Sequence, residues 1–267
     1  MTGKEKLSTN YTITWCPGCP NFIILESVKK AIGKLVDEGA KHEDFAMVTG
    51  IGCNSKIFDY INMSGIYGLH GRALPTAFGM KFANPKLKVI AFAGDGDTYA
   101  EGMEHFIHHC RYNADMTLIV HDNRAFSLTT GQATPTSQQG YKTKSEPFGE
   151  VNEPINPMKL ALSAGATFVA RCSAKDLQHS ADIIEKAINH KGFAFIEFVQ
   201  NCLIFNLADN IDKNIYKISD NGDDMERAMK LANEWDYNSL NEKVPIGIFY
   251  QVKKPTFEER YNKLKNG

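Results

Sequence analysis

Short apolar runs alternate along this chain with amphipathic segments, the pattern of strands that alternate with helices. Apolar runs of strand length lie at residues 45–49, 88–93, 116–121, 167–171 and 193–199. Apolar residues recur at helical spacing in residues 21–38, 73–82, 98–113 and 175–189. Strands that are buried on both faces and separated by helices are typical of parallel sheets. We therefore predict an α/β fold, a parallel sheet with helices on both faces.

Two stretches depart from this pattern. Residues 125–157 are rich in Thr, Gln, Gly and Pro and show no period, which predicts a long loop of the kind that is usually functional or partner-bound. From residue 206 onward the chain is more charged, with one helix expected near residues 224–234. We expect residues 1–205 to form the domain that carries the site. Residues 206–267 would form a C-terminal extension that packs on this domain or on a partner subunit.

Composition excludes several classes of protein. A formal net charge of −1, with acids and bases interspersed, argues against a nucleic-acid-binding surface. No apolar run reaches the roughly 18 residues of a membrane-spanning helix, and residues 1–10 are too polar for a signal peptide. We therefore expect a cytoplasmic protein with neither a membrane nor a nucleic-acid partner. Because cytoplasmic thiols stay reduced, the six cysteines indicate metal chemistry rather than disulfides.

The most informative motif follows the apolar run at residues 88–93, which ends in the sequence GDGD at residues 94–97. Its glycines permit a sharp turn and let anionic oxygens approach backbone N–H groups closely. Asp95 supplies a carboxylate suited to Mg²⁺. The motif alone is weak, because Gly-Asp-Gly is also an ordinary turn sequence.

The end of the next predicted strand strengthens this interpretation. The run at residues 116–121 leads into Asp-Asn at residues 122–123. The Asn123 amide oxygen and the Ala125 carbonyl oxygen can complete a metal site with two phosphate oxygens and water. With Thr-Thr-Gly-Gln following at residues 129–132, the spacing favours a thiamine diphosphate motif over a plain turn.

Cysteines form a second constellation. Four of them lie next to predicted turns or strand ends: Cys16, Cys19, Cys53 and Cys202. Four thiolates could bind a 4Fe-4S cluster, whose irons take one cysteine each. Zinc would need the same four thiols, whereas a redox dithiol would need only the first pair. Spacing alone does not distinguish a cluster, a zinc site and a redox dithiol. Cys110 and Cys172 lie on predicted apolar faces, so we interpret them as core residues.

Histidines are weaker signals. His70, in a loop, could hydrogen-bond a diphosphate or a reacting carbonyl, although a lone loop histidine is more often structural. His105, His108 and His109 follow the GDGD motif on a predicted helix, where we expect a partly exposed surface rather than a metal site.

Arg72 could pair with a phosphate or a carboxylate. Asn21 is the expected N-cap of the first helix, beside the first cysteine pair.

These residues together resemble the beta subunits of the 2-oxoacid:ferredoxin oxidoreductases over nearly the whole chain. The matching segments are WCPGC (15–19), TGIGC (49–53), GLHGRALPTAFGMKFANP (68–85), GDGD (94–97), HDNRAFSLTTGQATPTS (121–137), the strand that ends at Cys202, and PIGIFYQVKKPTFEER (245–260). Two positions depart from the family pattern. Phe126 stands where members usually have Tyr, and Thr130 stands where some have Lys.

The resemblance implies a set of site residues. Cys16, Cys19, Cys53 and Cys202 match the ligands of a 4Fe-4S cluster, and Asp95, Asn123 and the Ala125 carbonyl match those of Mg²⁺. His70 is the implied catalytic residue. The implied binding residues for thiamine diphosphate are Ile51, Gly52, Cys53, His70, Gly94, Asp95, Gly96, Asp97, Asn123, Ala125, Leu128 and Thr129.

The resemblance also implies an activity and partners. It implies coenzyme A-dependent oxidative decarboxylation of a 2-oxoacid, with single electrons passing through the cluster to ferredoxin or a ferredoxin-like subunit. An obligate alpha subunit would supply the activating glutamate and most of the substrate pocket, in an αβ heterodimer or an (αβ)₂ assembly. Residues 128–143 look more like the 2-oxoglutarate and broad 2-oxoacid branch than the pyruvate-only branch.

Two other functions use part of the same residues. A non-redox thiamine diphosphate-dependent decarboxylase or synthase subunit would keep the Asp95 and Asn123 site but need no iron. An electron-transfer or zinc-stabilised binding module would keep the cysteines but need no diphosphate site. Each alternative leaves one of the two constellations unexplained.

Overall fold

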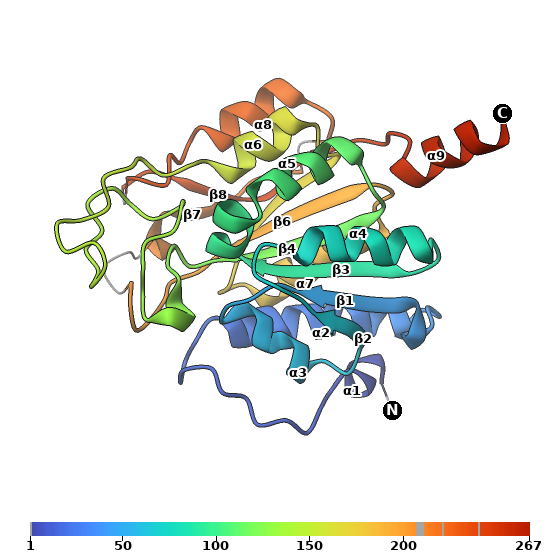
Figure 1. Ribbon diagram of the computed structural model, residues 1–267, viewed down its shortest axis with the longest axis horizontal. Helices are drawn as coiled ribbons and strands as arrows, with labels where there is room; N and C mark the ends of the chain where they lie inside the picture. Colours follow the sequence, from blue (N-terminus) through green and yellow to red (C-terminus); the bar gives the residue numbers. More distant parts are fainter. Residues whose placement is uncertain (1, 207–210, 221, 240) are drawn as a thin grey trace.

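The apolar runs come together as neighbouring strands of one eight-stranded sheet in the computed structural model, which describes residues 2–206, 211–220, 222–239 and 241–267 (Figure 1). The strand order across the sheet is β2-β1-β3-β4-β6-β5-β8-β7. The strands are β1 (Phe45–Thr49), β2 (Ser64–Tyr67), β3 (Lys88–Gly94), β4 (Met116–Asp122), β5 (Phe168–Ser173), β6 (Phe193–Val199), β7 (Ile215–Lys217) and β8 (Val244–Gln251).

The predicted parallel arrangement is confirmed for the strands β1 to β6, which all pair in parallel. The far edge differs, because β8 runs antiparallel to β5 and β7 pairs in parallel with β8. The pattern of apolar runs predicted none of β2, β7 and β8. β2 is short and all four of its residues are exposed, so its sequence carries no burial signal. The sheet is therefore mostly parallel with an antiparallel edge, a common form of α/β fold.

Helices cover both faces of the sheet, as predicted (Figure 1). The helices on one face are α1 (Gly3–Lys6), α2 (Asn21–Asp37), α3 (Ile57–Tyr60) and α7 (Leu177–Asn189). Those on the other are α4 (Ala73–Ala83), α5 (Met103–Tyr112), α6 (Pro157–Ala164), α8 (Met225–Ala232) and α9 (Phe257–Asn266). The chain also forms short single-turn helices, which are η1 (His42–Asp44), η2 (Asn54–Lys56), η4 (Ser127–Thr129) and η5 (Asp212–Asn214).

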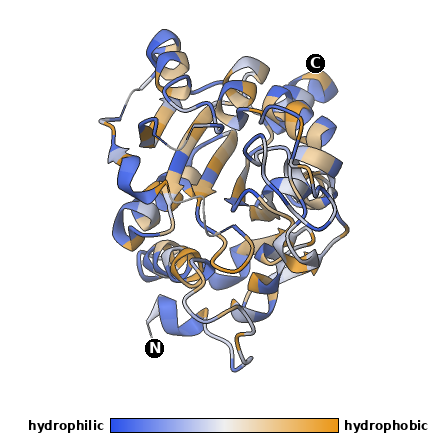
Figure 2. Cartoon of the chain, turned by 90° about the vertical axis from the view of Figure 1, so that its left-hand side faces the viewer, coloured by the Kyte–Doolittle hydropathy of each residue, from blue (hydrophilic) through white to orange (hydrophobic). Residues whose placement is uncertain are grey.

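Two cores result, because neighbouring residues of a strand point to opposite faces. Met47 and Phe92 pack under α2 and α7, whereas Val48 and Ala91 pack under α4 and α5. Figure 2 shows the central strands coloured mostly as hydrophobic and many outer turns as hydrophilic. Among the described helices, none is both long and apolar enough to cross a bilayer.

Two predicted helices begin differently. Pro20, not Asn21, is the N-cap of α2, and it makes no side-chain cap. Asn21 is buried in the first turn, where its Oδ1 atom lies 2.9 Å from His121 Nδ1. The helix expected at residues 98–113 starts instead with a π-helical turn, η3 (Asp97–Glu101), and α5 follows after Gly102. Such turns are rare and occur frequently at functional sites.

The predicted long loop is confirmed, since residues 130–156 contain turns and bends but no regular element. The described part of the C-terminal segment contributes β7, β8, α8 and α9, so it completes one edge of the sheet and part of one helical layer. Residues 207–210, 221 and 240 of the expected extension lie outside the described residues. A division of the chain at residue 205 stays a prediction.

Candidate functional site

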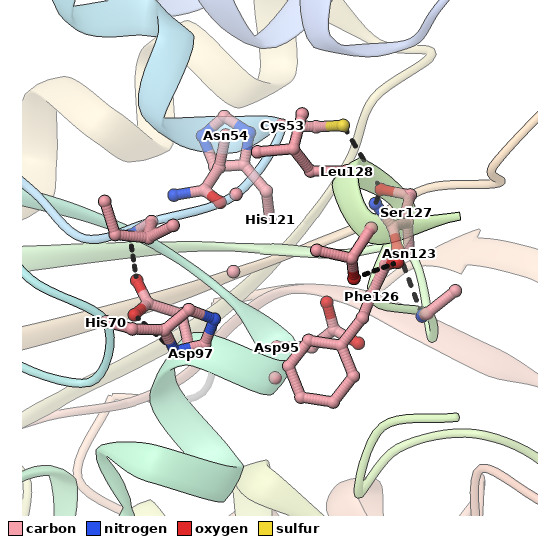
Figure 3. Close-up of a pocket in the computed structure, with 16 residues that line it drawn as sticks. Cys53, Asn54, His70, Asp95, Asp97, His121, Asn123, Phe126, Ser127 and Leu128 are labelled. Carbon is pink, nitrogen blue, oxygen red and sulfur yellow. Dashed lines mark hydrogen bonds and ion pairs between the residues drawn. The ribbon is translucent and has the colours of Figure 1, made fainter. Parts of the chain in front are cut away.

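A cavity lies at the carboxyl ends of β1, β3 and β4, the edge at which open parallel sheets bind ligands (Figure 3). Its walls include every residue that the sequence assigns to cofactor binding: Ile51, Gly52, Cys53, His70, Gly94, Asp95, Gly96, Asp97, Asn123, Ala125, Leu128 and Thr129. The remaining lining residues, which the sequence did not assign to binding, are Asn54, His121, Phe126 and Ser127. The structure thus gathers the predicted binding residues from three strand ends and two loops.

Asp95 is a buried residue in the wall of the cavity. Thr134 Oγ1 donates a hydrogen bond of 2.6 Å to its Oδ2 atom, and Thr136 Oγ1 lies 3.3 Å from the same oxygen. Burial raises the pKa of Asp95 to about 6, and the threonine hydrogen bonds oppose this shift. A divalent cation beside the carboxylate would favour its charged form, so the environment fits a metal ligand.

Asn123 and Ala125 supply the other predicted metal ligands. Both residues line the same cavity as Asp95, and the Ala125 N–H donates a hydrogen bond of 3.1 Å to Asn123 Oδ1. A carboxylate, an amide oxygen and a backbone carbonyl are the hard oxygen donors that Mg²⁺ takes alongside phosphate oxygens. The donor set therefore fits the implied ion.

Asp97 joins two loops at the rim of the cavity. Its Oδ1 atom accepts a hydrogen bond of 2.5 Å from the Gly71 N–H, and its Oδ2 atom accepts one of 3.2 Å from the Ile51 N–H. His70 Nδ1 lies 3.4 Å from Asp97 Oδ1 and 3.1 Å from Glu101 Oε2. Both carboxylates thus lie close to Nδ1 of the His70 ring, which makes no hydrogen bond among the described residues, and Figure 3 shows the ring beside Asp97.

His121 presents an unpaired nitrogen. Its Nδ1 atom contacts Asn21 Oδ1, while Nε2 is buried without a hydrogen-bond partner among the described residues. Burial lowers the pKa of His121 to about 3, so the ring is neutral at pH 7. Because the amide oxygen of Asn21 can only accept, Nδ1 carries the hydrogen and Nε2 is an acceptor. A polar ligand in the cavity could satisfy it.

Two positions at the cavity have no room for a side chain, so only glycine fits there. A Cβ atom at Gly50 would lie 1.7 Å from Asp97 Oδ2, and one at Gly96 would lie 2.1 Å from the Phe126 ring. Any side chain at either position would displace a residue that lines the cavity. The glycines thus let the strand-end turns approach the site closely.

A second cavity lies next to the first and contains the four predicted cluster cysteines. Its lining includes Cys16, Cys19, Cys53 and Cys202, together with residues 203–205. Burial, with smaller contributions from the neighbouring thiols, raises the pKa of Cys19 to about 11. Burial also raises the pKa of Cys53. Such thiols need positive charge nearby to ionise, which an iron cluster would supply, and one cysteine per iron fits four thiols.

The described residues include no group of three His, Cys, Asp or Glu side chains placed to bind a single metal ion. Cys110 and Cys172 are fully buried in the core, as predicted. The expectation for His109 was wrong, because its side chain is only 3% exposed and packs against Phe78, Tyr112 and Phe193.

Sequence reasoning missed several residues that shape the site. Thr134 and Thr136 lie in the long loop, whose lack of periodicity gave no hint of contacts with Asp95. Ser127 lies between the two cavities, inside the segment at residues 121–137 that carries several predicted binding residues. The length of the loop, and the family match of residues 121–137, were the signals that could have pointed to the two threonines.

Comparisons with known proteins agree with this geometry. Residues 50–198 match the family "Thiamine pyrophosphate enzyme, C-terminal TPP binding domain", and residues 204–266 match the C-terminal family of the "Pyruvate ferredoxin oxidoreductase beta subunit". The chain is 43% identical to the 2-oxoacid:ferredoxin oxidoreductase subunit beta of Saccharolobus solfataricus, over 92% of this chain and 84% of that protein. It is 37% identical to the 2-oxoglutarate synthase subunit KorB of Methanocaldococcus jannaschii, over 94% of this chain and 92% of that protein.

A solved structure is similar over the full length. The 2-oxoglutarate:ferredoxin oxidoreductase from Magnetococcus marinus, with 2-oxoglutarate, coenzyme A and succinyl-CoA bound, matches with a TM-score of 0.92 and 33% sequence identity. The match covers 100% of this chain and 90% of that chain. The fold and the family resemblance predicted from the sequence are thereby confirmed. This chain belongs to the beta subunits of the 2-oxoacid:ferredoxin oxidoreductases, oxidoreductases with a thiamine diphosphate-binding domain.

Proposed function

We propose that this chain binds thiamine diphosphate through Mg²⁺ and holds a 4Fe-4S cluster beside it. With its partners it carries out the coenzyme A-dependent oxidative decarboxylation of a 2-oxoacid, and the electrons leave singly through the cluster to ferredoxin. The observation that carries this proposal is the adjacency of two cavities, one lined by the predicted cofactor residues and one by four cysteines.

Asp95, Asn123 and the Ala125 carbonyl would hold Mg²⁺, and the turn at Gly94 and Gly96 would bring backbone N–H groups to the diphosphate. When bound, thiamine diphosphate supplies the carbon nucleophile for the 2-oxo carbon and the ring system that accepts the electron pair released with carbon dioxide. His70, which lies near two carboxylates, would hydrogen-bond the diphosphate or the reacting carbonyl.

The substrate class is a 2-oxoacid, and we favour 2-oxoglutarate or a broad range that includes pyruvate. The support is the similarity of residues 128–143 to that branch, together with the 2-oxoglutarate synthase subunit and the 2-oxoglutarate-bound oxidoreductase among the relatives. Leu128 lines the cofactor cavity and is 44% exposed, so it would face the substrate or the subunit that binds it.

A partner subunit would complete the site. Large apolar side chains are exposed around both cavities: Leu69 beside His70, Leu128, and residues 203–205 after Cys202. Exposed apolar surface of this kind marks protein interfaces. We propose that an alpha subunit covers it and supplies the activating glutamate, in an αβ or (αβ)₂ assembly. Residues 206–267 would act as an extension of the cofactor domain, in a cytoplasmic enzyme whose thiols stay reduced.

Iron analysis tests the cluster. After purification without oxygen, with whatever copurifies, the complex should contain at least about four irons per copy of this chain, and more if a ferredoxin-like subunit copurifies. Cys202→Ala should lose the cluster signal, whereas Cys172→Ala, which replaces a fully buried core thiol, should keep it. Wild-type protein without iron but with bound thiamine diphosphate would contradict the proposal and favour the non-redox thiamine enzyme. Iron without any thiamine diphosphate binding would instead favour an electron-transfer module.

Substrate choice and subunit dependence need an activity assay. We expect coenzyme A-dependent reduction of a viologen dye by the copurified complex, tested in parallel with pyruvate, 2-oxoglutarate and branched 2-oxoacids. The same assay on this chain alone should give no reduction, because it would lack the activating glutamate. Full activity from the isolated chain would contradict the proposed division of the site between subunits.

A further inference from the structure

Three residues line both cavities and so form the wall between them: Cys53, Asn123 and Ser127. Ser127 Oγ accepts a hydrogen bond of 3.1 Å from Asn123 Nδ2 and donates one of 3.4 Å to Cys53 Sγ. One hydroxyl therefore connects a proposed Mg²⁺ ligand with a proposed cluster ligand, and Figure 3 shows the dashed line from the Cys53 sulfur toward Ser127.

The direction of these hydrogen bonds follows from the chemistry of the groups. An amide nitrogen only donates, so the Ser127 oxygen accepts from Asn123. The hydroxyl carries a single hydrogen, which is then directed to the Cys53 sulfur. Asn123 Oδ1 in turn accepts from the Ala125 N–H at 3.1 Å, so the orientation of the amide is fixed at both ends. Hydrogen bonds arranged in such a chain strengthen one another.

We infer that Ser127 is a positioning residue with two effects, since it turns the Asn123 amide oxygen toward the metal and donates a hydrogen bond to the cluster through Cys53. The inference rests on the proposed function. Hydrogen bonds to ligating sulfurs favour the reduced, more negative state of an iron–sulfur cluster. The Ser127 hydroxyl would thus raise the reduction potential of the cluster and strengthen binding of the coenzyme that delivers electrons to it.

A purely structural role would have different consequences. If the hydroxyl only stabilised the η4 turn, its loss would weaken folding and leave the potential of the cluster unchanged. The reduction potential therefore separates the two roles. Ser127→Thr keeps the hydroxyl and provides a rescue variant, and Ser145→Ala provides a matched control on the exposed part of the long loop.

The test compares wild type, Ser127→Ala, Ser127→Thr and Ser145→Ala, each as the anaerobically purified complex. The midpoint potential is measured by redox titration with EPR detection, and the dissociation constant of thiamine diphosphate by calorimetry in the presence of Mg²⁺. Ser127→Ala should shift the midpoint potential to more negative values. The dissociation constant of thiamine diphosphate from this variant should rise about two- to tenfold, the factor that one hydrogen bond contributes. The other two variants should match wild type.

Two outcomes would overturn the inference. An unchanged midpoint potential in Ser127→Ala, with the cluster present, would show that the hydroxyl does not act on the cluster, whatever happens to coenzyme affinity. Wild-type complex without an EPR-active cluster would refute the proposed function and the inference with it. The wild-type measurement alone reveals this outcome, before any variant is compared.

Discussion

Thr134 Oγ1 donates a hydrogen bond of 2.6 Å to Asp95 Oδ2, so a hydroxyl from the long loop fixes the carboxylate at the end of β3. Both side chains are buried. Their contact joins the segment without periodicity to the turn that carries the GDGD motif. The carboxylate is consequently oriented before any ligand enters, and preorganisation of this kind lowers the cost of binding.

Removing this hydroxyl should weaken metal-dependent coenzyme binding. A hydrogen bond to a charged group contributes about 1.5–3 kcal/mol. Thr136 Oγ1 lies 3.3 Å from the same oxygen and would compensate in part if its hydrogen turned away from Asp122 Oδ1, which is at 2.9 Å. We therefore expect Thr134→Val to raise the dissociation constant of thiamine diphosphate about tenfold in calorimetric titrations with Mg²⁺. Thr9→Val, which removes a hydroxyl bound to the Asp59 carbonyl, should leave it unchanged. Equal affinities in Thr134→Val and wild type would show that Asp95 needs no support from the loop.

Asp97 should act through the loops that it joins. Asp97→Ala would remove the acceptors of the Gly71 and Ile51 N–H groups and one of the two carboxylates beside His70. We expect faster amide hydrogen exchange in residues 50–53 and 68–72, together with a loss of coenzyme affinity of at least about tenfold. Exchange followed by mass spectrometry would locate the change.

Asp236 provides a matched control for this variant. Its side chain is exposed, and its Oδ1 atom also accepts two backbone hydrogen bonds, from Asn238 and Ser239. Asp236→Ala should speed exchange only around its own turn and leave coenzyme affinity as in wild type. If Asp97→Ala left exchange in both loops unaltered, the carboxylate would not be what holds them.

The parts of the fold that were predictable share one physical origin. Apolar runs identify buried strands because parallel strands between helical layers are covered on both faces. Parallel strands also bring their carboxyl ends to one edge, so Asp95 and Asn123 could be placed together from sequence order alone. The four cysteines could be grouped from the sequence for a similar reason, because each lies next to a predicted turn or strand end.

The parts that escaped prediction depend on contacts between distant segments. Thr134 reaches Asp95 through a loop whose path no periodicity describes. His109 is buried because Phe78, packed on Phe257 of the C-terminal helix, lies against it, and nothing in the sequence around residue 109 signals that contact. The antiparallel direction of β8 is likewise set by pairing with β5 rather than by its own pattern.

A buried ion pair between β5 and β6 offers a test of how buried charge affects the stability of the sheet. Arg171 Nε donates a hydrogen bond of 2.8 Å to Glu197 Oε2, and Tyr237 OH lies 2.6 Å from both Arg171 Nη2 and Glu197 Oε2. All three side chains are fully buried. Arg171→Leu would leave the Glu197 charge buried without its partner, which costs about 3–5 kcal/mol of unfolding free energy.

The double variant separates the charge from the packing. Replacing Arg171 and Glu197 together by Leu removes both charges, and such exchanges are often close to neutral. In urea unfolding followed by circular dichroism, we expect the double variant to be more stable than Arg171→Leu alone. A double variant that is less stable than the single one would mean that the pair contributes through hydrogen bonds to its surroundings rather than through its internal charge balance.

His109 should make the stability of the protein depend on pH. Its Nδ1 atom lies 2.6 Å from the His105 carbonyl oxygen, and its Nε2 atom is buried without a hydrogen-bond partner among the described residues. Burial lowers the pKa of His109 from its ordinary 6.5 to about 4. The unfolded chain therefore binds the proton first as the pH falls. The stability contributed by neutral His109 is complete above pH 6.5 and is lost as the pH falls toward 4.

The size of this effect follows from 1.36 kcal/mol per pKa unit, which gives a loss of about 2–3 kcal/mol between pH 7 and pH 4.5. His109→Phe keeps an aromatic ring against Phe78 but cannot bind a proton. Between pH 7 and pH 4.5 its unfolding free energy should therefore fall by about 2–3 kcal/mol less than that of wild type. Urea titrations at several pH values measure the difference, and the other buried histidines titrate alike in both proteins. His108→Phe, on the exposed side of α5, should follow wild type. Parallel pH profiles for wild type and His109→Phe would mean that His109 accepts its proton without unfolding, and that its aromatic surroundings admit the charge.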